Sequence, residues 1–279
     1  MIKDSQTNKV YFSGYTEKYL QSFIKEVADL LTKHNIEFAF LKSTKDYFCR
    51  DYMPVQVNKD KFVQFVFRPT SYFEKKDYAY LSNPLRIELD NKLTKPYYSK
   101  LILDGGNVVN GETKVIITDK VFADNRFQMT EKEIMDELET LLEAEVIIIP
   151  ALKNDKTGHA DGMIRFIDDN TVLINELGLE DDERWETRFL KVLDQNRLKP
   201  KHLPVFDPEN DTASGIYINY LHVGKLIIVP TFKHPKQKNQ EAILKMKDYF
   251  PEYTIENVDA TDLAKEGGVL NCASWNILK

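Results

Sequence analysis

The chain has 279 residues, of which 42% are hydrophobic and 29% are charged, and its formal net charge is -6. This composition is typical of a folded globular protein, and the mild acidic excess argues against a nucleic-acid partner, which usually binds a basic face. With 2 cysteines, a disulfide framework is excluded and reduced thiols are expected. The polar start has no signal-peptide core, and the apolar runs are too short to span a bilayer. We therefore expect a cytoplasmic protein with no membrane partner.

Amphipathic helices alternate with short strands along the chain. Helical spacing of apolar residues predicts helices over 15–32, 130–142, 181–193 and 237–250. The second of these helices opens with a Thr-x-x-Glu capping box formed by Thr130 and Glu133. Between the helices, short apolar runs predict strands over 10–12, 38–41, 62–67, 115–118, 146–149, 172–174 and 226–229. Residues 72–93 are the least regular stretch and are expected to form a poorly defined helix and loops.

The strand–helix pattern recurs with a nearly constant period. Polar or glycine landmarks that follow the strands are spaced about 53 to 57 residues apart, at Asp51, Asp104, His159, Gly215 and Cys272. Five units of about 56 residues fill the chain and leave no range for a second domain. A cyclic array of five such units would form a propeller-like ring and bring one loop per unit to a common axis.

His159 and Asp161 lie in the segment Gly-His-Ala-Asp-Gly at 158–162. Alternate residues of an extended strand face the same side, so both side chains would face one pocket. The flanking glycines would allow a ligand to approach closely. An isolated motif of this kind is equally compatible with a capped loop and a turn. No nearby histidine or cysteine completes a tetrahedral zinc site, so we expect no metal.

Cys272 ends the segment Gly-Gly-Val-Leu-Asn-Cys at 267–272. The paired glycines indicate backbone shaped around a small group. A buried structural cysteine is the competing interpretation, because a free cysteine behaves as a small apolar residue. A cysteine with a histidine elsewhere in the chain is the usual starting point for a nucleophile hypothesis.

Two further segments, Cys-Arg-Asp-Tyr-Met-Pro at 49–54 and Leu-Asp-Gly-Gly-Asn at 103–107, supply Asp51 and Asp104. Each segment alone also fits a turn or a surface ion pair. Together with Asp161 they would place three carboxylates beside a thiol and an imidazole. Carboxylates crowded around a neutral ligand would bind protons, whereas a planar guanidinium satisfies them with paired N–H donors. The combination favours a small cationic guanidino substrate.

Four of these segments carry a family resemblance, in the order 49–54, 103–107, 158–162 and 267–272. They resemble the motifs of the agmatine deiminase and bacterial-type peptidyl-arginine deiminase family of guanidine-modifying enzymes. Segment 214–220, followed by 226–232, is similar to the strand pair of that family's fourth repeat. The resemblance implies an α/β pentein fold, a five-bladed pseudo-symmetric propeller of ββαβ repeats, with residues 1–279 as a single catalytic domain.

The resemblance also implies a role for each candidate residue. Cys272 matches the nucleophile, and His159 matches the general acid and base. Asp51 and Asp161 match the two carboxylates that grip the guanidinium. Asp104 stands where the family usually has Glu, the acid that orients the histidine.

The implied activity is hydrolytic deimination of a guanidino compound through a cysteine thiouronium intermediate, without a cofactor. Agmatine is the first expectation for the substrate, although Asn271 stands where agmatine deiminases commonly have His. Free or peptidyl arginine, another guanidine compound, and amidino transfer to an amine instead of water are the alternatives. A non-catalytic pentein binding platform is the alternative of another class, and the retained thiol, imidazole and acids favour an enzyme. The sequence leaves open whether the chain forms a homo-oligomer.

Overall fold

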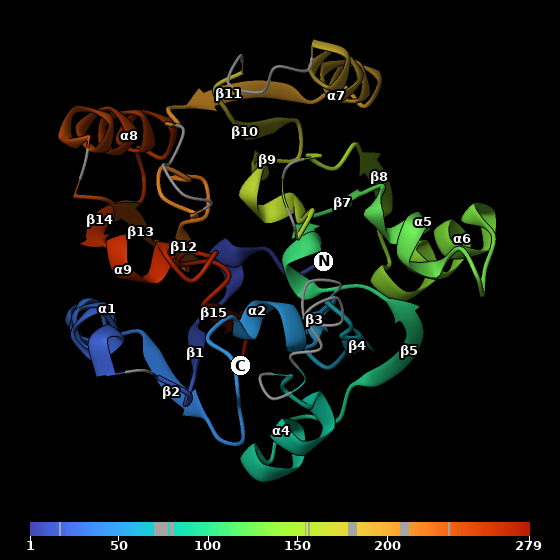
Figure 1. The fold of residues 1–279 in the computed structure, drawn as a ribbon, viewed down its shortest axis with the longest axis horizontal. Helices are drawn as coiled ribbons and strands as arrows, with labels where there is room; N and C mark the ends of the chain where they lie inside the picture. Colours follow the sequence, from blue (N-terminus) through green and yellow to red (C-terminus); the bar gives the residue numbers. More distant parts are fainter. Residues whose placement is uncertain are drawn as a thin grey trace.

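The computed structural model describes residues 1–279 except 17, 70–77, 79–80, 154, 156, 178–182, 207–211 and 234. In this described part, fifteen strands form five three-stranded sheets arranged as a ring (Figure 1). In each sheet the central strand pairs antiparallel with one neighbour and parallel with the other. A parallel pair needs a crossover connection, and a helix supplies it in every unit. The predicted ring of five strand–helix units is confirmed.

Four of the five units are continuous in sequence. In chain order they are β3 (Val55–Gln56), β4 (Phe62–Val66), α4 (Pro84–Asn91) and β5 (Tyr97–Ile102); β6 (Val109–Asn110), β7 (Lys114–Thr118), α5 (Lys120–Asn125), α6 (Glu131–Leu142) and β8 (Glu145–Ile149); β9 (Ile164–Asp168), β10 (Thr171–Asn175), α7 (Glu183–Gln195) and β11 (Lys199–Leu203); and β12 (Leu221–Val223), β13 (Leu226–Thr231), α8 (Lys236–Tyr249) and β14 (Thr254–Asp259).

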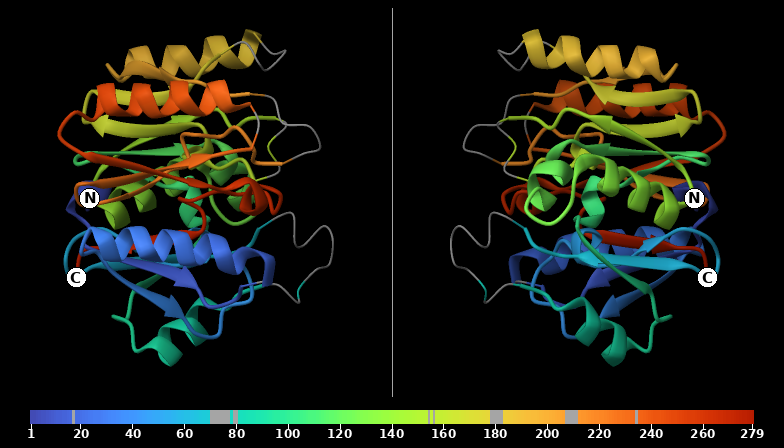
Figure 2. Two further views of the ribbon diagram at one scale, coloured as in Figure 1. Left: turned by 90° about the vertical axis from the view of Figure 1, so that its left-hand side faces the viewer. Right: turned by 90° about the vertical axis from the view of Figure 1, so that its right-hand side faces the viewer.

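The fifth unit is assembled from both ends of the chain. It contains β1 (Lys9–Ser13), α1 (Gln21–Lys33), β2 (Glu37–Leu41) and the last strand β15 (Ser274–Ile277). β15 pairs antiparallel with β1, so that Lys9 lies opposite Ile277 and Phe12 opposite Ser274. Figure 2 shows both termini on the same side of the ring. The C-terminal strand therefore closes the ring by completing the sheet that the N-terminal strand began.

The crossover helices α1, α4, α5, α6, α7 and α8 lie on the outside of the ring (Figure 1), and each buries at least one apolar residue. α1 buries Phe23, Val27 and Leu31, which are spaced four residues apart and so share one helix face. α6 begins with the predicted capping box, in which Thr130 and Glu133 satisfy each other's backbone N–H groups. In the described ranges no helix has both the length and the apolar character needed to cross a bilayer.

The predicted elements are present, with differences at their ends. The helix predicted over 15–32 begins as α1 only at Gln21, after a short 3-10 turn η2 (Lys18–Leu20). Of the stretch 72–93, residues 72–77, 79 and 80 lie outside the described residues, as do the first two residues of the predicted helix 181–193. In the described remainder of 72–93, α4 follows an Asn83 cap and begins with Pro84.

Five short connections between the units gather at the middle of the ring (Figure 1). Four of them are α2 (Cys49–Tyr52), the 3-10 turns η4 (Gly105–Asn107) and η5 (Ala160–Gly162), and turns within 214–219. The fifth is the turn at 270–273, which follows α9 (Thr261–Ala264) and leads into β15. Segment 214–220 is therefore not the strand it was expected to be, and β12 begins only at Leu221. Cys49 is buried in the helical turn α2.

Candidate active site

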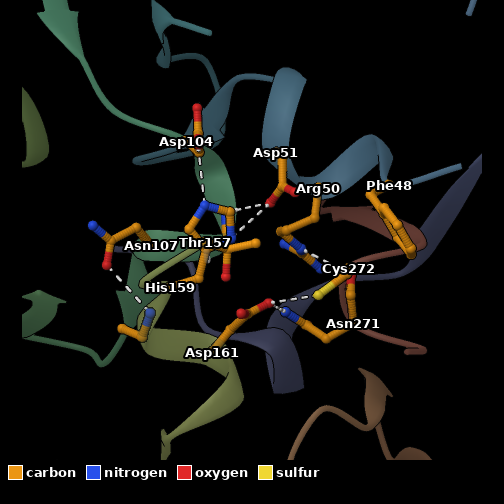
Figure 3. A network of polar contacts seen from close by, with 12 residues as sticks. Phe48, Arg50, Asp51, Asp104, Asn107, Thr157, His159, Asp161, Asn271 and Cys272 are labelled. Carbon is orange, nitrogen blue, oxygen red and sulfur yellow. Dashed lines mark hydrogen bonds and ion pairs between the residues drawn. The ribbon is translucent and has the colours of Figure 1, made fainter. Parts of the chain in front are cut away.

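The predicted site residues come together at these central connections (Figure 3). Asp51 belongs to α2, Asp104 directly precedes η4, and Cys272 lies in the turn before β15. His159 and Asp161 were expected to alternate on an extended strand, and this expectation is wrong. His159 is extended, with φ -83° and ψ 141°, but Asp161 lies inside the 3-10 turn η5. The turn still directs both side chains toward the same centre.

The His159 imidazole lies between two carboxylates. Its Nε2 is 3.1 Å from Asp104 Oδ2, and its Nδ1 is 3.5 Å from Asp51 Oδ1. Burial acts to lower the pKa of His159, but the charge of Asp51 and the hydrogen bond and charge of Asp104 outweigh it and raise the pKa to about 10. The two carboxylates therefore favour the protonated form of the ring. Although Asp104 is one methylene shorter than the expected Glu, its carboxylate reaches the ring.

The Asp51 carboxylate faces the same centre and accepts a hydrogen bond from the Gly106 N–H at 3.1 Å. Burial raises the pKa of Asp51 to about 8. The charges of Asp104 and Asp161 add to this effect, and His159 opposes it. A Cβ at position 106 would lie 2.4 Å from Asp51 Oδ1, 2.8 Å from His159 Nδ1 and 3.4 Å from Asp161 Oδ2. Three functional groups thus surround one small volume, which any side chain at this position would fill.

The Cys272 thiol lies on the other side of Asp161. Its Sγ is 3.5 Å from Asp161 Oδ2, and the Asn271 amide Nδ2 donates to the same oxygen at 2.7 Å. Burial raises the pKa of the Cys272 thiol well above its usual range, and the charges of Asp161 and Asp51 raise it further. In the absence of a bound cation the thiol therefore keeps its proton.

Asn219 is a residue of the site that the sequence did not assign. Its Nδ2 donates to Cys272 Sγ at 3.2 Å, and its Oδ1 accepts from the backbone N–H groups of Asn271 and Cys272 at 3.1 and 3.2 Å. The fourth landmark of the repeat was placed at Gly215, four residues too early. A buried amide inside the apolar run 216–221 was the available signal, but core packing explains such a residue equally well from sequence alone.

A second buried amide fixes the turn that carries His159. The Oδ1 of Asn107 accepts from the backbone N–H groups of Thr118 and Ala160 at 3.0 and 3.2 Å. The Thr118 hydroxyl in turn donates to the Gly158 carbonyl at 2.7 Å. The turn is therefore tied to the neighbouring sheet through β7, which limits the movement of the imidazole.

These groups suit an organic cation better than a metal ion. Among the described residues, no group of three or more His, Cys, Asp or Glu side chains is arranged to hold a metal. The Asp51 and Asp161 carboxylates instead face one small volume next to the Cα of Gly106. A planar guanidinium placed there could donate N–H groups to both Asp51 and Asp161.

Comparison with known proteins agrees with this arrangement. A model of the Porphyromonas-type peptidyl-arginine deiminase family matches residues 5–277. An agmatine deiminase from Pseudomonas aeruginosa (strain LESB58) is 27% identical over 206 residues, which are 61% of this chain and 55% of that protein. The chain thus spans little more than half of the length of this curated relative.

Solved structures share the fold at low sequence identity. The agmatine deiminase of C. jejuni superposes with a TM-score of 0.80 at 21% identity, covering 100% of this chain and 95% of that one. An amidinotransferase from Microseira wollei superposes with a TM-score of 0.65 at 12% identity, covering 99% and 95%. The pentein fold expected from the sequence is confirmed, and enzymes of different reaction types share it.

Proposed function

The chain belongs to the Porphyromonas-type peptidyl-arginine deiminase family, and from this premise we propose that it hydrolyses the guanidinium group of a small cationic substrate. The products are ammonia and the corresponding ureido compound. The observation that carries the proposal is the convergence of a thiol, an imidazole and two carboxylates on the volume in front of Gly106. Neither the thiol nor the imidazole is needed merely to bind a cation.

Asp51 and Asp161 are the proposed guanidinium clamp. Each carboxylate can accept N–H donors from one edge of the planar cation, which fixes its plane relative to the Cys272 thiol. Holding the reacting atoms in this orientation can supply about 7–11 kcal/mol of a reaction barrier in favourable intramolecular models. The bound positive charge also offsets the carboxylates that raise the pKa of Cys272, so substrate binding promotes formation of the thiolate.

The chemical steps follow from the positions of the thiol and the imidazole. When the bound cation has lowered the pKa of Cys272, the thiol releases its proton to solvent, and the resulting thiolate attacks the central guanidinium carbon and forms a C–S bond. Protonated His159 donates its proton to the departing nitrogen, the C–N bond breaks and ammonia leaves a thiouronium on the sulfur. His159, now neutral, takes a proton from a water that attacks the same carbon. The C–S bond then breaks while the hydroxyl proton of the adduct passes to the sulfur, which returns the thiol and releases the ureido product. Asp104 stabilises the charged ring through its hydrogen bond to Nε2.

Agmatine is the proposed substrate because the matched curated relative is an agmatine deiminase. Arginine within a peptide is the second candidate, favoured by the description of the matching family. Both carry the same guanidinium on an alkyl chain, so the clamp and the nucleophile would treat them alike. Their other ends differ in charge and bulk.

Trapping the covalent intermediate tests the mechanism. The protein is mixed with agmatine, quenched in acid within one turnover and examined by mass spectrometry. We expect an amidino adduct on the peptide that contains Cys272, and none on the peptide that contains Cys49. Cys49 is the matched control thiol because it is fully buried and hydrogen-bonded to the carbonyls of Tyr11 and Ala273. Turnover with no adduct at either thiol would contradict nucleophilic catalysis by cysteine.

A further inference from the structure

Arg50, like Asn219, is hydrogen-bonded to the turn that carries the Cys272 thiol. The backbone N–H of Arg50 donates to the Cys272 carbonyl at 3.0 Å, and its Nε donates to the Asn271 carbonyl at 3.4 Å. Asn219 accepts from the N–H groups of the same two residues. Asn219 therefore binds the backbone N–H groups of this turn, and Arg50 binds its carbonyl groups. Figure 3 shows Arg50 beside Cys272 and one residue before Asp51.

The far end of the Arg50 side chain reaches a small polar cavity. The cavity has a volume of about 20 Å³, and its polar lining includes Asp4, Arg50, Gln56, Asn110 and Asn276. Three buried atoms of these residues have no hydrogen-bond partner within the described ranges, namely Arg50 Nη2, Asn110 Oδ1 and Asn276 Oδ1. Such atoms are rare in folded proteins, and three on one cavity point to a shared partner.

Several other polar atoms of this lining already have partners in the protein. The amide nitrogens of Asn110 and Asn276 donate to the carbonyls of Ile2 and His222 at 3.4 and 2.7 Å. Asp4 is bound to Arg165 at 2.5 Å. The amide orientations therefore leave the two Asn oxygens as acceptors and Arg50 Nη2 as a donor.

One water molecule meets all three requirements. It can accept one hydrogen bond from the guanidinium and donate two to the amide oxygens. A chloride ion would leave both oxygens without donors, and a metal cation would be repelled by the guanidinium. A water needs roughly 10–15 Å³ of such volume, so this cavity has room for one.

We propose that this cavity binds a single structural water that links Arg50 to Asn110 and Asn276, and that Arg50, held in this way, is a positioning residue for Cys272. The water lies behind the reacting groups and takes no part in bond making. Its effect reaches the thiol through the two carbonyls of the turn. The kinetic part of the test rests on the proposed function, and the structural part does not.

A double-variant cycle tests the link between Asn110 and Arg50. Asn110→Leu removes one acceptor of the water and is expected to lower kcat about tenfold, with KM changed by less than about twofold, because it disturbs the placement of the thiol and not the clamp. In an Arg50→Met background the same change should have no further effect, because both act through one water. Independent, multiplying losses in the double variant would overturn the proposal.

Asn196→Leu is the matched control for Asn110→Leu. Asn196 is also a half-buried amide whose Nδ2 donates to a backbone carbonyl, that of Val192 at 2.8 Å, but it directly follows α7 and does not line the cavity. The Asn196→Leu variant should have the same kcat as the unaltered protein. An Asn110→Leu variant that behaves like this control overturns the proposal.

Two readouts remain if no guanidino compound is turned over. The first is the rate at which chloroacetamide alkylates Cys272 without substrate, which should fall in Asn110→Leu and Arg50→Met alike. The second is a high-resolution crystal structure of the unaltered protein, which should show a water about 2.7–3.2 Å from the three atoms. A dry cavity, or unchanged alkylation in both variants, overturns the proposal. If no guanidino compound is turned over but both readouts are as expected, the result counts against the proposed function and not against the structural water.

Discussion

Replacing Gly106 by alanine should disable the site while leaving the fold in place. The added Cβ would lie 2.4 Å from Asp51 Oδ1 and 2.8 Å from His159 Nδ1. Ordinary van der Waals contact begins near 3.4 Å, so the Asp51 carboxylate must retreat by about 1 Å. Gly106 does not have a positive φ, so the backbone itself accepts alanine. A displacement of about 1 Å can cost about 100-fold in rate, or about 3 kcal/mol of activation free energy.

The assay is ammonia release under saturating and limiting substrate, accompanied by thermal unfolding. We expect kcat/KM of Gly106→Ala to fall about 100-fold, with a loss of about 1–3 kcal/mol in unfolding free energy from overpacking. Gly162→Ala is the control, because a Cβ there meets nothing within 4 Å and this glycine also has no positive φ. If Gly106→Ala is folded and as active as Gly162→Ala, the guanidinium does not bind between these groups and the proposed geometry is refuted.

Three further results are expected. In the proposed mechanism, Asp51 must lose its proton to bind a cation, and His159 must keep its proton to release ammonia. The value of kcat/KM should therefore rise as pH increases through about 8 and fall as pH increases through about 10. Asp104→Asn removes a carboxylate that raises the pKa of His159, so an unmoved alkaline limb in the pH–rate profile of this variant would contradict the role of Asp104. Asn219→Ala should lower kcat about 100-fold. Because it leaves two N–H groups unpaired, it should also reduce the free energy of unfolding, measured by urea titration, by about 1–3 kcal/mol. An unaltered kcat would show that the Asn219 amide does not position the thiol. Thr130→Ala breaks the capping box and should cost about 1 kcal/mol of stability with no change in kcat, as calorimetry and the same activity assay would show; a drop in kcat would mean that the helix affects the distant site.

The sequence allowed the ring to be predicted because its signals repeat. Apolar spacing identified the helices, and a period near 56 residues indicated five equivalent units. The same period predicted that Asp51, Asp104, His159 and Cys272 would meet, and these residues do lie at equivalent connections. The sharing of one unit between β1 and β15 was not foreseen, since pairing between the two ends of a chain leaves no local pattern.

The local conformation at the site was less predictable. His-Ala-Asp was interpreted as a strand because alternation is the simplest way to put two side chains on one side. The structure uses a 3-10 turn, held by the Asn107 amide from another unit, and such a tertiary contact is invisible in a local pattern. Asn219 was not assigned a role for a related reason. Its hydrogen bonds to the Cys272 turn join segments 53 residues apart, and a single buried amide gives no sign of its partners.

The central claim is most directly tested by ammonia release from agmatine, free arginine and an arginine peptide, each offered to the unaltered protein and to Cys272→Ala. We predict turnover of agmatine by the unaltered protein and none by Cys272→Ala. Turnover of the peptide instead would retain the chemistry and change the substrate. No ammonia from any of the three, together with no adduct on Cys272 from a haloacetamidine probe, would contradict the account and favour a pentein that only binds its ligand.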